Sequence, residues 1–355
     1  MASNLRIFDH FAKSLAYLEA PTTPRSWVLN GYGKAEFSLG LQYLQDRFNP
    51  REETIVKYNN LVFITHVPTQ DAAGNVNGKL PDWVGIILPD RNWTFRVLGV
   101  TAYSAEAILT FRPMPLTAIK GTPGSMFKEM LNYAHAVADD IVIQPGIIED
   151  IPEQFADSLV TSAYDHIKKL CMNAGMNFDV TGQIDSRGNL QLYANLYRRK
   201  GADTRLELTQ DNTEGGGPLL TEQGTPYNVV YGYTQASTKE SRYFAKGVNQ
   251  ASVDKYGVLA KNQTFSGIRD QTALANAAQT MADALAEPVK MIRRVALDSG
   301  DTFDSLAVGN TVGVKDTTVG FKPGGGFGFE ARARILSLDY NDLTVGKAPL
   351  HLEII

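Results

Sequence analysis

Cysteine is almost absent from this chain of 355 residues. The single one, Cys171, cannot form an intramolecular disulfide, and its neighbours Leu170 and Met172 indicate a buried thiol. No apolar run approaches the ~18 residues needed to span a membrane. The first 20 residues contain Asp9 and Lys13 and lack the apolar core of a secretory leader. We therefore expect a chain without a membrane segment that is made and folded in a cytoplasm.

A surplus of positive charge is also missing. Lysine and arginine total 34 against 38 acidic residues, a formal charge of −4, whereas dedicated nucleic-acid binders usually carry a basic surplus. Two small basic clusters, Arg198-Arg199-Lys200 and Arg293-Arg294, are interpreted as solvated strand ends. The alternative is weak, sequence-independent contact with DNA, because isolated clusters supply only a few phosphate contacts.

Chemical motifs are scarce. No two histidines lie within the spacing of a standard zinc site, and no Gly-x-Ser-x-Gly elbow is present. The acidic doublets Asp139-Asp140 and Glu149-Asp150 could pair for glycoside hydrolysis, but helix-end charge is the commoner cause. Gly31-Tyr32-Gly33-Lys34 lacks the hydroxyl residue of a P-loop. We predict no catalytic, cofactor-binding or metal-binding residues, and no enzyme. The histidines are His10, His66, His135, His166 and His351.

Glycine and aromatic residues are plentiful, with 31 Gly, 15 Tyr and 16 Phe, which is typical of β-rich structure. Asn30-Gly31 is a tight-turn signal, and Ala35, Phe37 and Leu39 alternate with polar residues as in a half-buried strand. Ser104 is expected to cap a short helix through Leu109. The N-terminal strands predicted in this way are Leu5–Phe8, Ala35–Leu39, Thr54–Tyr58, Leu61–Thr65, Trp83–Leu88 and Val100–Tyr103, the third and fourth forming a hairpin across Asn59-Asn60.

The middle of the chain has helical periodicity. Ser125 can cap a helix over Met126–Ala138, and apolar positions predict a second helix over Glu153–Ala174 that ends at Gly175. The strands Asn177–Thr181 and Leu190–Ala194 follow as a hairpin. This segment is therefore α/β in character.

The C-terminal part returns to strands with one helix. Gly215-Gly216-Gly217-Pro218 predicts a loop, and Gly324–Gly328 predicts a second one. An Ala-rich helix is expected from Asp270, its N-cap, to Ala286, stopped by Pro288. The predicted strands are Asn228–Tyr233, Met291–Leu297, Leu306–Val314, Arg332–Tyr340 and Leu350–Ile354.

These elements predict a mainly β fold with an α/β insertion and two barrel-like domains. The expected division is a first β-barrel over 1–118, an α/β middle domain over 119–212, and a second barrel with one helix over 213–355, with interleaving allowed.

The order of motifs resembles the tail hub proteins of bacteriophages, which include central baseplate hubs and the hub regions of tail-associated proteins. The likeness rests on Trp27–Leu39, Trp83–Ile87, Val97–Arg112 and Ser252–Val314. Within the third of these segments, the matching positions are Ala102, Tyr103, Ser104, Glu106, Leu109 and Arg112. No peptidase or glycosidase extension follows Ile355, so we expect the hub portion alone.

The resemblance implies a virion protein of the tail tip or baseplate. It would form a homotrimeric, pseudo-sixfold ring from two tube domains per subunit, join the tail tube to the tip and let double-stranded DNA pass. Its implied partners are distal tail or tail tube proteins and a tail-tip fibre or spike. Exposed strands such as Val229–Tyr233 are expected at ring interfaces.

Two other classes of function stay open from the sequence. A cell-wall hydrolase is favoured if the acidic doublets converge in a cleft. A carbohydrate- or receptor-binding module of a tail tip is favoured if aromatic residues such as Trp83 and Trp93 lie exposed in a row.

Overall fold

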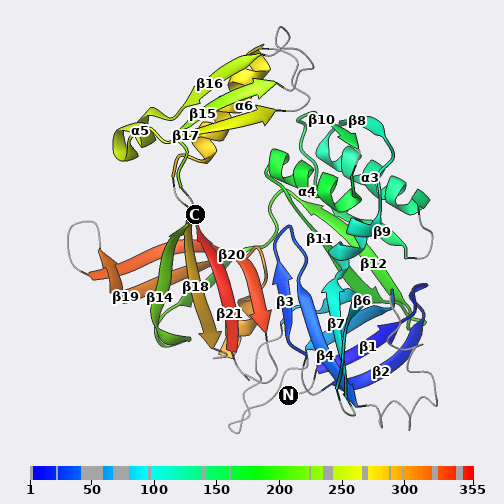
Figure 1. The fold of residues 1–355 in the computed structure, drawn as a ribbon. Helices are drawn as coiled ribbons and strands as arrows, with labels where there is room; N and C mark the ends of the chain where they lie inside the picture. Colours follow the sequence, from blue (N-terminus) through cyan, green and yellow to red (C-terminus); the bar gives the residue numbers. More distant parts are fainter. Residues whose placement is uncertain are drawn as a thin grey trace. The chain divides into compact units, whose positions relative to one another are not determined.

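The computed structural model is mainly β, as the sequence predicts. It divides into two compact units (Figure 1). The larger contains 1–219 and 293–353 with Ile355, and the smaller contains 220–292 with Ile354. The described residues are 3–20, 23–40, 59–66, 80–94, 97–137, 141–159, 161–223, 225–234, 243–265, 271–287, 289–297, 300–321, 327–340 and 347–355.

One sheet of 13 described strands links the two ends of the chain. Its path runs β14-β18-β21-β20-β3-β4-β7-β6-β5-β1-β2, with β19 pairing β20 and β13 pairing β19. The N-terminal strands are β1 (Ser3–Phe8), β2 (Ser14–Ala20), β3 (Arg25–Val28), β4 (Lys34–Gly40), β5 (Leu61–His66), β6 (Trp83–Thr94) and β7 (Val97–Ser104). The later strands are β13 (Asp203–Leu208), β14 (Thr213–Gln223), β18 (Val289–Leu297), β19 (Thr311–Phe321), β20 (Phe327–Tyr340) and β21 (Lys347–Ile354).

Side-chain alternation buries one face of the N-terminal strands. Along β4, Ala35, Phe37 and Leu39 are buried and their neighbours are exposed. They pack with Leu5 and Ile7 of β1 in one apolar cluster. A one-residue slip would expose the whole set, so burial fixes the register.

The α/β segment packs on an apolar core that it shares with strands β1, β5 and β6 of the large sheet and with the 3₁₀ helix η1 (Ala105–Phe111). Sheet β11-β12-β9 combines an antiparallel hairpin with one parallel neighbour, and β10 pairs with β8. Its elements are β8 (Thr117–Gly121), α3 (Pro123–Val137), β9 (Ile143–Ile148), β10 (Phe155–Leu159), α4 (Ala163–Ala174), β11 (Asn177–Ile184) and β12 (Leu190–Tyr197). A second 3₁₀ helix, η3 (Gly300–Ser305), precedes β19.

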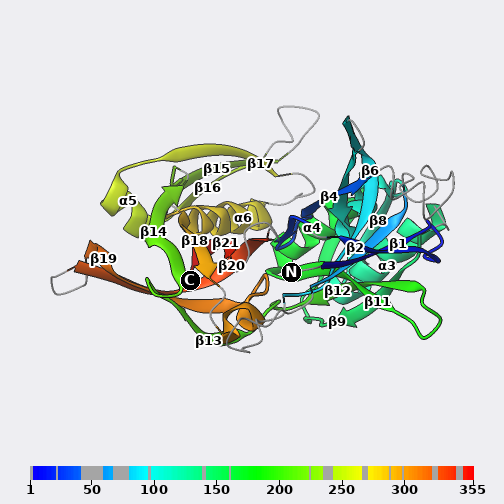
Figure 2. The same ribbon diagram turned by 90° about the horizontal axis from the view of Figure 1, so that it is seen from below.

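The smaller unit is a three-stranded sheet covered by a helix (Figure 2). Helix α6 lies along β15 and β16 and buries Leu274, Ala278 and Ala282. Gly232 and Gly247 permit this close approach, because a Cβ at Gly247 would lie 2.2 Å from the Ala278 carbonyl oxygen. The elements are β15 (Val229–Thr234), β16 (Phe244–Val248), α5 (Gln250–Tyr256), β17 (Ala260–Phe265) and α6 (Gln271–Ala284).

Several predicted elements are confirmed. The hairpin in the α/β segment forms as β11 and β12, and Gly175 ends α4 in the left-handed conformation with φ 64°. The predicted Ala-rich helix corresponds to α6, and the strand at Met291–Leu297 lies within β18. Cys171 is buried, and burial raises the pKa of its thiol to about 12.

The helix predicted over Glu153–Ala174 is wrong in its first half. Residues Phe155–Leu159 form β10, and only Ala163–Ala174 is helical, with the Ser162 hydroxyl accepting a hydrogen bond from the Asp165 amide. The four-residue spacing of Phe155 and Leu159 fits both periods, but pairing with β8 selects the strand.

Other local predictions need correction. The stretch Gly215–Pro218 lies within strand β14 and is not a loop. Helix α3 begins at Pro123, so Ser125 lies in its first turn and is not the cap. Strand β15, which was expected to be an exposed strand at a ring interface, is the central strand of its sheet. Helix α5 was not predicted at all.

Some predictions lie outside the described residues. These are the strand at Thr54–Tyr58, the doublet Asp139-Asp140, the N-cap Asp270, the stop at Pro288 and most of the loop Gly324–Gly328.

The turn between β3 and β4 gives the first testable prediction. A Cβ at Gly33 would lie 1.9 Å from the Ser26 carbonyl oxygen, so Gly33→Ala should lower the free energy of unfolding by about 1–3 kcal/mol or more. Denaturant unfolding measures this loss. Gly188→Ala is the control, since its added methyl meets no atom within 4 Å and only its φ of 82° is unfavourable. An equal effect of both substitutions would contradict the steric argument.

Candidate functional site

The junction between the N-terminal and C-terminal strands is the structural centre of the larger unit. Strand β3 pairs with β20 through four successive residue pairs, from Val28↔Ser337 to Arg25↔Tyr340. On its other side β3 meets β4 at Arg25↔Ala35, and the Glu36 amide donates to the Pro24 carbonyl at 2.8 Å. Strand β3 therefore joins two sets of strands that lie about 300 residues apart in the chain.

A buried arginine stabilises this junction. Arg25 is 3% exposed, and one guanidinium nitrogen donates to Ser3 Oγ, Thr23 O and Thr23 Oγ1 at 2.9–3.1 Å. The guanidinium also lies over the ring of Tyr340, 5.0 Å from its centroid. A planar guanidinium suits stacking and several hydrogen bonds together, so lysine could not replace it.

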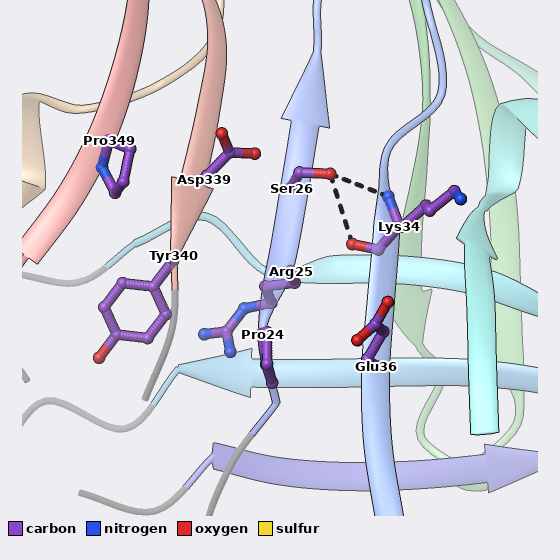
Figure 3. A pocket seen from close by; sticks show the side chains of 8 residues that line it. All are labelled: Pro24, Arg25, Ser26, Lys34, Glu36, Asp339, Tyr340 and Pro349. Carbon is purple, nitrogen blue, oxygen red and sulfur yellow. Dashed lines mark hydrogen bonds between the residues drawn. The ribbon is translucent and has the colours of Figure 1, made fainter. Parts of the chain in front are cut away.

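An open pocket of about 380 Å³ lies over the junction (Figure 3). Ser26 donates to the Lys34 carbonyl and accepts from its amide, which holds β3 against β4. Burial raises the pKa of Asp339 in the pocket wall above its ordinary value. The electrostatic interaction with His351 lowers this pKa but does not cancel the rise. The lining residues are Pro24, Arg25, Ser26, Lys34, Glu36, Asp339, Tyr340 and Pro349.

The acidic doublet Glu149-Asp150 serves the fold locally. Asp150 accepts hydrogen bonds from the Gly124 amide at 2.8 Å and the Thr122 hydroxyl at 2.6 Å, so it satisfies the N-terminus of α3. Burial raises the pKa of Asp150, but these hydrogen bonds outweigh it and lower the pKa below its ordinary value. Glu149 accepts from the Arg198 amide at 2.8 Å. The helix-end interpretation of this doublet therefore agrees with the geometry.

A histidine and an aspartate join α4 to β10. His166 Nδ1 lies 2.7 Å from Asp157 Oδ2, and Nε2 accepts the Thr161 amide at 3.2 Å with the Thr161 hydroxyl at 3.1 Å. Lys169 Nζ lies 2.6 Å from the other oxygen of Asp157. Thr161, His166 and Asp157 are arranged like the nucleophile, base and acid of a catalytic triad. However, the Thr161 amide donates to the Nε2 lone pair of His166, which a general base needs free. This geometry is that of a structural link.

The first basic cluster follows the end of β12, and Arg198 and Arg199 are exposed there, as the prediction of a solvated strand end requires. The guanidinium of Arg198 donates to the Asp150 carbonyl, and Arg199 donates to Thr311 Oγ1 at 2.6 Å. Arg294 is fully buried with Asp316, 3.2 Å away. The prediction of a solvated strand end is thus wrong for Arg294, and burial also excludes its contact with DNA. Arg293 is exposed.

A second pocket, of about 280 Å³, contains a buried carboxyl group that the sequence marked only as a motif position. Glu106 accepts from Ser104 Oγ at 2.6 Å and from the Val180 amide at 3.0 Å. Burial raises the pKa of Glu106, the nearby negative charge of Asp179 raises it further, and the two hydrogen bonds lower it without restoring it. Asp179 is itself paired with Lys200 at 2.6 Å.

The structure predicts a pH dependence from Glu106. Its folded-state pKa lies above the ordinary value, so the folded chain binds this proton more tightly than the unfolded chain does. Stability from Glu106 is full below the ordinary pKa near 4.5 and is lost as pH rises through the folded pKa. Glu106→Gln should remove this loss, which reaches about 1.4 kcal/mol per pH unit between the two pKa values.

Denaturant unfolding from about pH 5 to about pH 8 measures the effect of Glu106. Glu153→Gln, at an exposed position, is the matched control and should keep the wild-type pH profile. Parallel profiles for wild type and Glu106→Gln would contradict the assignment.

The buried pair Arg294–Asp316 gives another test. Arg294→Met should lower the free energy of unfolding by about 3–5 kcal/mol, because it leaves the Asp316 carboxylate buried without its cation. Arg294→Met with Asp316→Asn should recover much of this loss in denaturant unfolding, since no buried charge remains. A double variant as unstable as the single one would refute this account.

No cluster of three or more histidine, cysteine, aspartate or glutamate side chains in the described ranges is arranged to hold a metal ion. Among the described helices, none is long and apolar enough to cross a membrane.

The fold matches solved tail proteins along nearly the whole chain. A 43 kDa tail protein of prophage MuSo2 from Shewanella oneidensis has a TM-score of 0.59 at 10% identity, covering 100% of this chain and 98% of that one. A tail protein from Neisseria meningitidis has 0.58 at 14%, covering 99% and 97%. The prophage tail protein gp18 from Listeria monocytogenes has 0.56 at 12%, covering 99% and 94%. No family model matches the sequence, and no curated protein matches it.

These likenesses lie at 10–14% identity and therefore establish the fold. The chain has the fold of prophage tail proteins. The resemblance inferred from Trp27–Leu39, Trp83–Ile87, Val97–Arg112 and Ser252–Val314 is confirmed at this level.

Proposed function

We propose that this chain is a structural hub protein of a bacteriophage tail tip or baseplate. Three copies form a ring with pseudo-sixfold symmetry that joins the tail tube to the tip and lets double-stranded DNA pass. The observation that supports this proposal most is the match of the complete fold to prophage tail proteins, with 100% of this chain and 98% of the Shewanella protein covered.

The proposed ring requires two β regions in each subunit. In the proposed division, 1–118 and 213–355 are barrel-like tube domains, and 119–212 is the α/β domain between them. Three subunits then supply six tube domains around a threefold axis. The junction at β3 supports this arrangement, because it joins strands of both regions in one sheet.

Ring closure requires two different surfaces on each subunit, one for each neighbour. The path of described strands ends at β2 on one side and at β14 on the other. Edge strands present unpaired backbone groups that a neighbour can use. Exposed apolar side chains near the first edge, Phe11 at 59% and Tyr17 at 44%, support β2 as one contact surface. Helix α6 has its apolar face against its own sheet and is not proposed as a contact.

Double-stranded DNA is roughly 20 Å across. A channel that lets it pass must be wider than this diameter. A cationic wall would bind the phosphates through counterion release and hinder sliding, so we expect an acidic or neutral wall. The charge of −4 and the intrachain contacts of Arg198, Arg199 and Arg294 agree with this expectation.

The proposed partners are distal tail or tail tube proteins on one side of the ring and a tail-tip fibre or spike on the other. The proposed location is the tail tip or baseplate of the virion, after synthesis in the cytoplasm of a bacterial host. The residues that the sequence singled out for the two alternatives do not support them, since Trp83 is 1% exposed and Asp150 of the second acidic doublet caps α3. The Trp93 side chain lies outside the described residues.

The expected assembly is a homotrimer on the tail axis. Light scattering of the purified chain should give three times the mass of 38.9 kDa, and a particle reconstruction should have this chain in a ring around the axis. Tyr17→Lys should weaken the trimer, because it adds a charge to the proposed β2 contact. Asn189→Lys, on the turn between β11 and β12, is the control.

A monomer by light scattering is compatible with a ring that forms on neighbouring tail proteins, so the reconstruction decides. Density for this chain away from the tail axis would overturn the proposal.

A further inference from the structure

The three-stranded sheet of the smaller unit has one face covered by α6 and an opposite face with a different composition. Residues alternate between faces along a strand, and Gly232 and Ala245 face the helix. The registers Tyr233↔Phe244 and Tyr231↔Lys246 therefore place these four side chains on the opposite face. On the third strand, Asn262 pairs with Tyr231 and Thr264 with Tyr233. We call these six side chains the aromatic face: Tyr231, Tyr233, Phe244, Lys246, Asn262 and Thr264.

The rings on the aromatic face are adjacent and accessible. Phe244 is 49% exposed, its ring lies 5.9 Å from that of Tyr231 at 19°, and 5.4 Å from that of Tyr233. Lys246, Asn262 and Thr264 are also exposed. Tyr231 and Tyr233 are half-buried. The three rings form one ridge whose apolar surface is partly open to water, which favours a ligand surface.

The composition of the aromatic face distinguishes among ligands. Its rings present flat apolar surfaces, while the tyrosine hydroxyls, Asn262 and Thr264 supply donors and acceptors beside them. Pyranose rings have the complementary pattern, with C–H groups on the face and hydroxyls at the edge. Lys246 is charged and no member of the set is acidic, so the face disfavours cations.

The size of the aromatic face also favours a narrow ligand. Three strands at about 4.8 Å spacing and two rows of side chains cover on the order of 200 Å². A stable protein interface needs about 800 Å² on each partner. A single glycan chain lying across the strands fits the smaller area.

We infer that the aromatic face binds a polysaccharide built of pyranose rings that carry no positive charge. Sugar rings stack on Phe244 and Tyr233, Asn262 and Thr264 bind their hydroxyls, and Lys246 binds a carboxylate where the polymer is acidic. This site is separate from the ring-forming role, and its binding does not require the ring.

The test uses the full chain in native gels that contain dextran, a neutral glucan, or alginate, a polyuronate. Dextran or alginate should slow the chain. Phe244→Ala should raise the dissociation constant about tenfold, because it removes the most exposed ring. Lys246→Glu should weaken alginate binding, because it replaces the cation that faces the carboxylates with a like charge.

Phe111→Ala is the matched control, since Phe111 is 57% exposed on η1 and outside the aromatic face. It should bind as wild type does. Circular dichroism checks that each variant is folded.

Absence of retardation by both dextran and alginate would overturn the inference, and so would unchanged binding by folded Phe244→Ala. If Phe244→Ala instead reduces the mass of a self-associated species and no glycan binds, the face is a contact between copies of the chain and the inference fails. Loss of ring formation with glycan binding intact would reject the proposed hub and leave this inference standing.

Discussion

The pairing of β3 with β20 is the interaction on which the larger unit depends. Four residues near the start of the chain must find a strand that ends at Tyr340, and loop-closure entropy opposes such a contact. Burial around Arg25 compensates for this, because its guanidinium binds Ser3 and Thr23 while stacking on Tyr340. The junction therefore combines backbone hydrogen bonds with the stacking of Arg25 on Tyr340, a contact that forms only when β3 and β20 pair.

Local sequence patterns correctly predicted the elements whose signals fit only one kind of secondary structure. The alternation at Ala35–Leu39 and the left-handed stop at Gly175 depend on neighbouring residues alone, and both were correct. Phe155–Leu159 was assigned to a helix because a spacing of four fits either period in a short segment. Gly215–Pro218 was assigned to a loop because its composition disfavours strands, yet it lies in β14, where tertiary pairing overrides local propensity.

The buried polar groups could not be predicted, since each depends on contacts distant in sequence. Arg294 looked like a surface residue beside Arg293, but Asp316 lies 22 positions later and the pair is buried. Glu106 meets the Val180 amide 74 positions away. A signal existed only for Asp150, whose doublet indicated a helix end, although the Gly124 amide that it accepts from lies 26 residues earlier. Such groups fix one register against alternatives, because any slip leaves a charge buried without its partner.

The fold of the smaller unit does not depend on the β3–β20 pairing or on these buried polar groups, because of where it is inserted in the chain. Strands β14 and β18 flank it in sequence and are neighbours in the large sheet, so the chain leaves and re-enters that sheet at adjacent positions. An insertion with adjacent ends adds little loop-closure entropy and need not alter the register of the host sheet. Its own core of Val230, Ala245, Leu274, Ala278 and Ala282 holds α6 on one face. Packing therefore determines that face. Phe244 on the other face is 49% exposed and lies outside this core, as the proposed ligand surface requires.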